Sequence, residues 1–399
     1  MRSRYYRDVN GKPTIKARLY EQLDHKISRL DIDADARKIC SRLSFQGHQA
    51  YIVGGAVRDL LLGRIPKDFD IATDALPNRV RRLFRNSRII GKRFRLVHVF
   101  FQDGKIHEVA TFRSPESGDR HHVYGTLFED VMRRDFSFNA LYYDPEEEIV
   151  LDFVGGVEDI RKGVVKSVLP LKVSFVEDPV RMLRAVKYAV ITGMIISPAV
   201  TRRILKDAPL LATASISRLS EELYKILNSG YAESILRLME RYRIFDYLLP
   251  GLSKIHSNEK ENQVLRESTY RSLAKLDKIM QNEGGNRAIM IRYLYEGALV
   301  ASKDLDTEDA HGLLYNDAVR VLKEIIKPLV QPNRDVEEAV KLIFRDRDLP
   351  IPKKRPRHPG IWGGASKAGM IVADGTDTRR QKKRRNRKKR RNREANNNG

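Results

Sequence analysis

The chain has 399 residues, of which 41% are hydrophobic, and a formal net charge of +23 at pH 7. This length exceeds one ordinary hydrophobic core and predicts two or three domains. The single cysteine, Cys40, excludes an intrachain disulfide and a cysteine-rich zinc site, and it indicates a reducing, cytoplasmic compartment. The long apolar run at residues 189–200 is too short to span a bilayer.

Positive charge is concentrated near the C-terminal end. Residues 379–393 contain twelve Lys or Arg and no acid, and the rest of the chain is still basic without them. This excess predicts a polyanionic partner. From residue 346 onward the composition, rich in Pro, Lys, Arg and Gly, predicts a disordered basic tail. Residues 1–30 are polar and basic and predict a loosely attached leader.

Between these ends the hydrophobic pattern changes from mixed to helical near residue 160. The predicted strands are 49–53, 67–72, 95–101, 106–111 and 149–154, and the predicted helices are 33–45, 56–62, 77–84 and 129–142. After residue 160 only helices are predicted: one capped by Asp178 with Pro179 at its first position, then 217–227, 232–242 and 267–345. The sequence therefore predicts an α+β fold with an all-helical second part.

Residues 51–73, YIVGGAVRDLLLGRIPKDFDIAT, combine a Gly-Gly turn, a helix start and two carboxylates. Gly54 and Gly55 let the backbone approach a phosphate, and Arg58 stands in the first helical turn, where an acid is more usual. Asp68 and Asp70 lie one residue apart on the predicted strand, so both carboxylates can face one divalent cation. A solvated strand edge or a turn is the commoner meaning of such a pair by itself.

Glu108 stands in the middle of an otherwise apolar strand, where an acid without a partner is costly. It is the candidate for a third carboxylate beside the aspartate pair. The alternative is a salt bridge with Arg113 or Arg95.

Two further motifs combine acids with arginines: RRDFSFNAL at 133–141 and EDPVRMLRAVKYA at 177–189. By itself, RRD more commonly forms a surface charge cluster. Asp178 and Arg181 lie three residues apart at a helix start, so a carboxylate acceptor and a guanidinium donor can together meet the edge of a base. The alternative is an N-cap with a salt bridge between these two residues. Arg184 and Tyr188 continue the same face and can stack on a base or contact a phosphate.

In this order and spacing, GGAVRDLLLG, KDFDIAT, RRDFSFNAL and EDPVRMLRAVKYA resemble the class II tRNA nucleotidyltransferase and bacterial poly(A) polymerase family, over about residues 28–250. The resemblance implies a polymerase-beta-type nucleotidyltransferase head at 31–160, a helical neck at 161–250 that binds RNA and nucleotide, and a helical body at 251–345. It makes Asp68 and Asp70 the ligands of two Mg²⁺ ions, with Glu108 as the third carboxylate. The implied nucleotide-binding residues are Gly54, Gly55, Arg58, Arg133, Arg134, Asp135, Asn139, Asp178, Arg181 and Arg184.

A later stretch, SRLSEELYKIL, resembles the neck motif of the same family. There Arg218, Glu221 or Glu222, and Lys225 would brace the nucleotide pocket, and we interpret this role as mainly structural.

Several activities share these motifs. Residues 89–101, IIGKRFRLVHVFF, resemble the signature of bacterial poly(A) polymerases, and the basic tail resembles theirs and would bind RNA backbone without reading its sequence. The resemblance implies template-independent addition of AMP from ATP to RNA 3′ ends, such as those of mRNA. The alternatives are a CCA-adding or A-adding tRNA nucleotidyltransferase and a catalytically inactive RNA-binding protein. The expected RNA contacts are Lys92, Arg93, Arg95, Arg384, Arg385, Lys388, Lys389 and Arg390.

Overall fold

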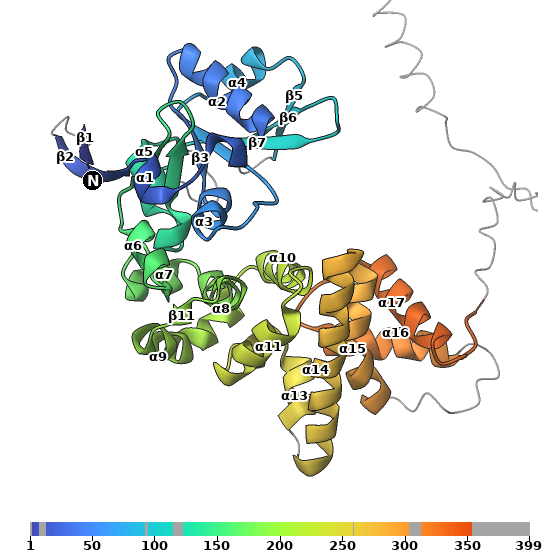
Figure 1. Cartoon of the computed structure of the whole chain (residues 1–399). Helices are drawn as coiled ribbons and strands as arrows, with labels where there is room; N and C mark the ends of the chain where they lie inside the picture. The colour runs from blue at the N-terminus through green and yellow to red at the C-terminus, as the bar shows by residue number, and fades with distance from the viewer. Residues whose placement is uncertain are drawn as a thin grey trace, which may run out of the picture. The chain divides into compact units, whose positions relative to one another are not determined.

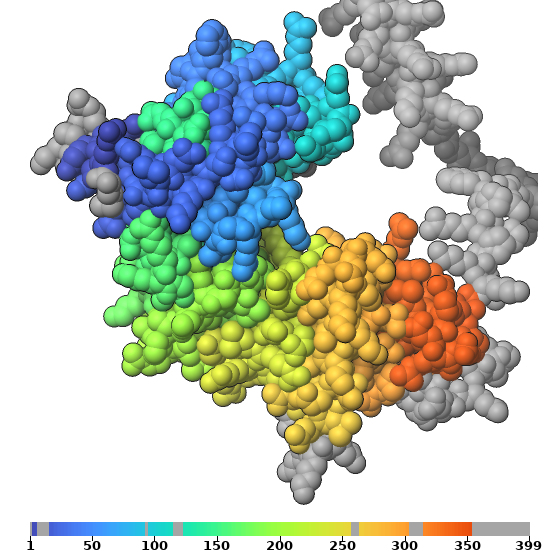
Figure 2. Space-filling model, in the orientation of Figure 1, coloured from blue at the N-terminus to red at the C-terminus, as the bar shows by residue number. Residues whose placement is uncertain are grey.

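A computed structural model of the protein describes residues 2–7, 13–91, 95–114, 123–257, 259–302 and 313–352. These residues belong to one compact unit, Met1–Pro352. A mixed sheet comes first along the chain and helices follow it, which confirms the α+β prediction (Figure 1). Residues close in sequence lie together in space, as the continuous blocks of colour in Figure 2 show. The predicted tail from residue 353 onward lies outside the described residues.

The head is built on a nine-stranded sheet in the order β1-β2-β9-β8-β3-β4-β7-β6-β5. Strand β4 pairs with β7 in parallel, and the other neighbours in this sheet pair antiparallel. The strands are β1 Arg2–Arg7, β2 Pro13–Tyr20, β3 Ala50–Val53, β4 Asp70–Thr73, β5 Ser87–Ile90, β6 Leu96–Phe100, β7 Ile106–Thr111, β8 Leu141–Asp144 and β9 Ile149–Asp152. The predicted strands at 95–101 and 106–111 are confirmed as β6 and β7, which pair antiparallel.

The first strands correct the prediction of a loosely attached leader at residues 1–30. Strand β2 pairs with β9, with Leu19 opposite Leu151, and β1 pairs with β2 at the edge of the sheet. Alternation along β2 buries Ala17 and Leu19 and leaves Arg18 exposed. Arg18 is one of the charged residues that suggested a loosely attached leader, and it lies on the exposed face of a paired strand.

The region predicted as one helix at 129–142 is also different. Helix α5 spans Leu127–Met132, a short 3-10 turn covers Ser137–Asn139, and β8 follows at Leu141–Asp144. Strand β8 forms because Tyr142 and Tyr143 are fully buried while their backbones pair with β3 and β9. Sheet pairing with segments distant in sequence overrides the local helical pattern here.

Helices cover the sheet and make up the rest of the described chain (Figure 1). In the head they are α1 Gln22–His25, α2 Ala34–Phe45, α3 Gly55–Leu61, α4 Pro77–Leu83, α5 and α6 Gly156–Arg161. The later helices are α7 Leu171–Glu177, α8 Val180–Thr192, α9 Pro198–Asp207, α10 Ile216–Leu227, α11 Ala232–Arg241, α12 Phe245–Leu248, α13 Pro250–Ser257, α14 Glu259–Asn282, α15 Arg287–Ser302, α16 Leu313–Ile326 and α17 Asn333–Arg345. Two short strands, β10 Val164–Val165 and β11 Ile195–Ile196, pair in parallel after residue 160, where no strand was predicted.

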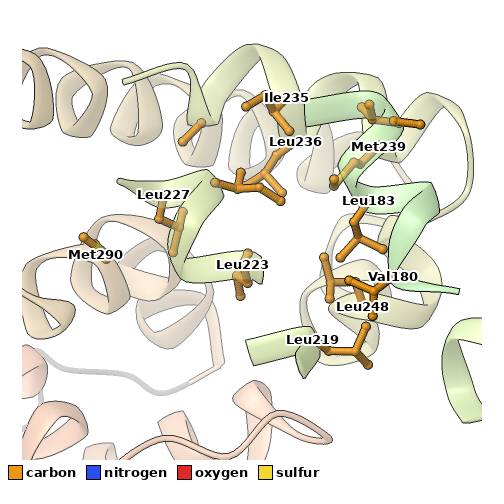
Figure 3. Packing of buried hydrophobic residues seen from close by; sticks show 14 of the residues in the cluster. Val180, Leu183, Leu219, Leu223, Leu227, Ile235, Leu236, Met239, Leu248 and Met290 are labelled. Atoms are coloured by element: carbon orange, nitrogen blue, oxygen red, sulfur yellow. The ribbon is translucent and has the colours of Figure 1, made fainter. Parts of the chain in front are cut away.

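Helix α8, which carries the EDPVRMLR motif, is fixed by a continuous apolar core. Leu183 on α8, Leu219 and Leu223 on α10 and Leu236 on α11 are all buried in it (Figure 3). Burial of one leucine side chain contributes about 1.5–3 kcal/mol. The opposite side of α8 is then free to present charged side chains to the head. No helix of the described chain is long and apolar enough to cross a membrane.

Candidate active site

One cavity of about 590 Å³ gathers the predicted nucleotide-binding residues. Its walls come from the start of α3, from the segment between α5 and β8, and from helices α8 and α10. The lining residues are Gly54, Gly55, Arg58, Asp70, Arg133, Arg134, Asp135, Asn139, Asp178, Val180, Arg181, Arg184, Tyr188, Arg218, Glu221, Glu222 and Lys225. Two predicted residues, Asp68 and Glu108, do not line it.

The Gly-Gly turn forms one wall, and its first glycine is required by geometry. Gly54 has a φ of +68°, in the region that favours glycine. A Cβ at this position would lie 3.1 Å from Nη1 of Arg134. The turn can therefore bring backbone close to a ligand only with glycine at position 54.

Arg58 is buried beneath this turn and is held by two partners. Its Nη1 donates to Oδ1 of Asn139 at 2.8 Å, and its Nε donates to Oδ1 of Asp59 at 2.8 Å. Its guanidinium also lies 5.0 Å from the centre of the Tyr188 ring. Arg58 thus connects the α3 turn, the RRDFSFN segment and helix α8.

The aspartate pair differs from the prediction in one respect. Strand β4 begins at Asp70, so Asp68 lies before the strand and the alternation of a strand does not place the two on one face. Strands β4 and β7 pair in parallel, with Ile71 opposite Val109. This register places Asp70 next to Glu108, the third acid, on the neighbouring strand.

These three carboxylates affect one another electrostatically. Desolvation by surrounding protein atoms, followed by repulsion from Glu108 and Asp68, raises the pKa of Asp70 to about 6. Asp70 as a whole residue is nevertheless exposed, so a cation can reach it and relieve the repulsion. Hard divalent cations such as Mg²⁺ prefer carboxylate oxygens, and the donor set therefore fits such an ion.

Glu108 has a partner that the sequence did not predict. Its Oε1 lies 3.1 Å from Nε2 of His98, which is directly opposite on β6. The expected alternative partners were Arg113 and Arg95, and the structure supplies a histidine instead.

A separate group of possible metal ligands lies on α2 and β7. Among the described residues, ligand atoms of Asp33, Asp35 and His107 lie within 4.8 Å of one another. Asp33 accepts hydrogen bonds from the backbone N–H groups of Asp35 and Ala36 and lies 3.1 Å from Nζ of Lys105. This arrangement caps helix α2, and the sequence did not single it out for chemistry.

The paired arginines of RRDFSFN bind a buried acid and do not form a surface cluster. Arg133 and Arg134 contact the two carboxylate oxygens of Asp130 at 2.8 and 3.0 Å. Burial acts to raise the pKa of Asp130, but Arg134 and Arg133 outweigh it and hold that pKa well below its usual range. Asp130 was not among the predicted site residues. Its i, i+3 and i, i+4 spacing to the two arginines would have indicated it.

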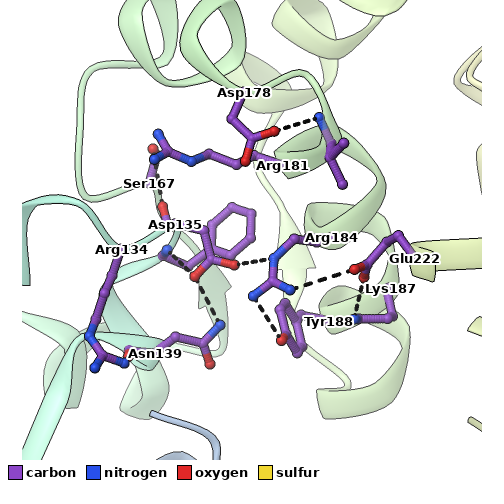
Figure 4. Close-up of polar contacts among 12 residues, drawn as sticks. Arg134, Asp135, Asn139, Ser167, Asp178, Arg181, Arg184, Lys187, Tyr188 and Glu222 are labelled. Atoms are coloured by element: carbon purple, nitrogen blue, oxygen red, sulfur yellow. Dashed lines mark hydrogen bonds and ion pairs between the residues drawn. The ribbon is translucent and has the colours of Figure 1, made fainter. Parts of the chain in front are cut away.

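Asp135 begins a polar network that crosses from the head to two helices (Figure 4). Its Oδ1 accepts from Nδ2 of Asn139 at 3.1 Å, and its Oδ2 accepts from Nε of Arg184 at 2.7 Å. Burial acts to raise the pKa of Asp135, and Arg184 and Asn139 lower it in net. The Asp135 carboxylate is therefore held charged in a fixed orientation at the cavity wall.

The network continues from α8 to α10. Arg184 lies 3.6 Å from Glu222, and the buried ammonium of Lys187 forms a short ion pair with the same carboxylate. The cations of Arg58, Arg184 and Lys187 all lie within 5.2 Å of the centre of the Tyr188 ring. Such contacts between a cation and an aromatic face are attractive. Glu222 and Tyr188 thus connect residues from three different elements.

Asp178 and Arg181 line the cavity, but they are not paired with each other. Asp178 accepts from the backbone N–H of Val180 at 3.3 Å and from Nη2 of Arg218 at 2.6 Å (Figure 4 shows the first contact). Arg181 donates to the carbonyl oxygen of Arg133 at 3.1 Å and to Oγ of Ser174 at 3.1 Å. The predicted N-cap is wrong by one residue, because the N-cap of α8 is Pro179 and Asp178 is the C-cap of α7. The predicted salt bridge to Arg181 is replaced by one to Arg218.

Of the predicted RNA contacts, only Arg95 belongs to the described residues. Arg95 is exposed just before β6 and does not line the cavity. Lys92, Arg93, Arg384, Arg385, Lys388, Lys389 and Arg390 lie outside the described residues.

Comparison with known proteins gives matches along most of the chain. Residues 50–166 match the family described as the poly A polymerase head domain, and residues 193–255 match the probable RNA and SrmB-binding site of polymerase A. Poly(A) polymerase I of Escherichia coli is 37% identical over 332 residues, which cover 78% of this chain and 71% of that protein. Poly(A) polymerase I of Haemophilus influenzae is 36% identical, with 88% and 82% covered.

Enzymes that add CCA also match. The CCA-adding enzyme of Geobacillus stearothermophilus is 38% identical over 246 residues, covering 59% of this chain and 58% of that protein. Among solved structures, the CCA-adding enzyme of Bacillus stearothermophilus in complex with CTP superimposes with a TM-score of 0.52 at 28% identity, covering 78% of this chain and 82% of that one.

Proposed function

Because the chain belongs to the poly(A) polymerase family of nucleotidyltransferases, we propose that it transfers AMP from ATP to the 3′ end of RNA without a template and releases pyrophosphate. The observation that supports this most directly is one cavity that joins the Gly54 turn, Asp70, Asp135, Asp178 and Arg181. The backbone turn and the guanidinium groups can bind phosphates, and a carboxylate can bind a metal ion. A carboxylate acceptor and a guanidinium donor can together bind the edge of a base.

Poly(A) addition is favoured over CCA addition by how far the sequence similarity extends. Identity to the poly(A) polymerase of Escherichia coli continues over 78% of this chain, whereas identity to the CCA-adding enzyme of Geobacillus stearothermophilus covers 59%. The segment at 89–101 also resembles the signature of poly(A) polymerases. CCA or A addition to tRNA remains the second candidate, because CCA-adding enzymes match this chain as well.

In the proposed reaction two of the three carboxylates would hold two Mg²⁺ ions. Asp68 and Asp70 would be the ligands, with Glu108 beside them. When bound, Mg²⁺ favours attack of a hydroxyl on phosphorus and neutralises charge on the leaving pyrophosphate. Among the residues lining the cavity we identify no separate general base for the 3′-hydroxyl.

The remaining residues would bind and orient the nucleotide. Arg58 and Arg134 lie at the glycine turn, where guanidinium groups suit triphosphate oxygens. Asp135 has both oxygens engaged by protein donors, yet an ionised carboxylate has about four acceptor positions and can still accept from a ribose hydroxyl. Arg218 and Ser174 hold Asp178 and Arg181 in place, which would prepare them to meet the edge of adenine.

The raised pKa of Asp70 predicts how magnesium dependence changes with pH. Below about pH 6 the carboxyl is increasingly protonated and a proton competes with the ion, so the apparent affinity for Mg²⁺ should fall between pH 7 and pH 5. Glu108→Gln removes one repelling charge, so it should lower the pKa of Asp70 and move this fall to lower pH. Magnesium titrations of initial rate at several pH values measure both. An unchanged midpoint in the Glu108→Gln variant would contradict the coupling.

The choice among activities is tested with one nucleotide at a time. Purified protein is incubated with ATP, CTP, GTP or UTP and either oligo(A) or a tRNA that lacks its CCA end. We expect long products from ATP alone on oligo(A). Addition of CTP followed by ATP to the tRNA, with termination after CCA, would favour the second candidate. Salt-sensitive RNA binding without magnesium-dependent turnover would indicate an inactive RNA-binding protein.

The basic segment at 379–393 is proposed to contact the RNA backbone through charge alone. Arg384, Arg385, Lys388, Lys389 and Arg390 would act with Lys92, Arg93 and Arg95 as positive sites for phosphates.

A further inference from the structure

A second cavity of about 650 Å³ adjoins the nucleotide cavity. It lies between α10, the start of α15 and the start of α17, and its lining includes Tyr224, Lys225, Asn286, Arg287, Met290 and Asp335. Glu221 and Lys225 line both cavities. We call this second space the α10–α15 cavity.

Helix α10 separates the two spaces and presents a different face to each. Glu221 and Lys225 lie one turn apart on a shared ridge. Arg218 and Glu222 lie on the side of this ridge that faces the nucleotide cavity, and Tyr224 and Asn228 lie on the side that faces the α10–α15 cavity. A ligand that extends from one cavity into the other therefore passes over Glu221 and Lys225.

The α10–α15 cavity offers a flat aromatic surface. The guanidinium carbon of Arg287 lies 4.5 Å from the centre of the Tyr224 ring. A planar group therefore already lies against this ring, and a base stacked on the same face would take its place. The Tyr224 hydroxyl donates a short hydrogen bond to Gln331, which fixes the orientation of the ring. The buried side chain of Met290 adds an apolar surface to the wall.

Charged and polar groups surround this aromatic surface. Lys225 and Arg287 are exposed cations, placed to meet phosphate groups. Asn286 and Asp335 add donors and acceptors for the edge of a base. An aromatic ring for stacking, together with cations for the backbone, is the combination by which proteins bind single-stranded nucleic acid.

We propose that the α10–α15 cavity binds a base near the 3′ end of the RNA, stacked on Tyr224, with Lys225 and Arg287 contacting the adjoining phosphates. The inference rests on the proposed function, since it concerns the RNA that this function extends. It assigns RNA binding to residues of α15 and α17, beyond the family match at 193–255. The base concerned is one of those just before the terminal nucleotide, because the terminal 3′-hydroxyl must reach the neighbouring nucleotide cavity.

The test uses RNA primers in which a single nucleotide lacks its base. One abasic residue is moved through the last four positions of an oligo(A) primer, and the Michaelis constant for primer is measured with the full-length protein. For the wild type we expect one position from the second to the fourth to raise this constant about tenfold, as loss of one stacked base does. In Tyr224→Ala the constant should already be raised for the intact primer, and the same abasic residue should raise it no further.

Further variants separate stacking from a loss of folding. Tyr224→Phe keeps the ring and should retain the wild-type abasic profile. Arg287→Gln, at an exposed position, should raise the Michaelis constant for primer and leave that for ATP unchanged. Arg320→Gln is the matched control, because Arg320 is exposed on α16 and does not line the cavity; it should change neither constant.

The outcomes distinguish this proposal from the proposed function. Wild-type extension of the intact primer with ATP reports on the function alone. The same abasic profile in the wild type and in Tyr224→Ala would overturn the assignment of the cavity. An altered constant for ATP with an unchanged primer profile in Arg287→Gln would also overturn it.

Discussion

Asp70→Asn is expected to lower the rate of AMP transfer at least about 10³-fold, because stabilisation of transition-state charge by a bound metal is worth several kcal/mol. The thermal stability of the metal-free protein should stay the same or rise, since the substitution removes one of three mutually repelling carboxylates. Initial rates with ATP and oligo(A), together with thermal unfolding, measure the two effects. Asp68→Ala should show the same loss of activity.

Asp103→Asn provides the matched control. Asp103 is an acid in the turn between β6 and β7, and its carboxylate contacts Lys105. This variant should keep nearly the wild-type rate. A rate within a few fold of the wild type for Asp70→Asn would contradict the assignment of Asp70 as a metal ligand.

The second large effect concerns the buried pair of Lys187 and Glu222. Glu222→Leu should lower the free energy of unfolding by about 3 kcal/mol or more, because it leaves the Lys187 ammonium buried without its partner. The double variant Lys187→Met/Glu222→Leu should recover most of this loss, since two apolar side chains replace two charges in the same space. Denaturant unfolding of the wild type, Lys187→Met, Glu222→Leu and the double variant measures the coupling.

An exposed pair supplies the comparison. Lys327 and Glu324 lie 2.7 Å apart, and both side chains are more than 60% exposed. Glu324→Gln should change the free energy of unfolding by less than about 1 kcal/mol. If Glu222→Leu were no more destabilising than Glu324→Gln, the Lys187–Glu222 pair would not contribute to the stability of the fold.

Local signals were sufficient for much of this molecule. The helices predicted at 33–45 and 77–84 are α2 and α4 of the structure, and the Gly54–Gly55 turn marks the junction of β3 and α3. The order of the charged motifs also gave the residues that the structure gathers around one cavity. Their roles in binding nucleotide and metal remain predictions.

What the sequence did not give depends on contacts between distant segments. Strand β2 exists because β9, more than 100 residues later, pairs with it, and no local pattern reports that pairing. The Lys187–Glu222 pair joins residues on two helices whose packing is decided by the apolar core between them. The sequence marked Glu222 as part of a motif, but it could not supply its partner.

The polar network of Asp135, Arg184, Glu222 and Lys187 has a consequence for the working temperature of the protein. The free-energy cost of removing charges from water falls as temperature rises, whereas the stabilisation from buried apolar surface increases little further. The contacts between the RRDFSFN segment, α8 and α10 therefore keep more of their strength on warming than a purely apolar junction would. Heating should loosen the apolar contacts around this network before it separates the charged side chains that line the cavity.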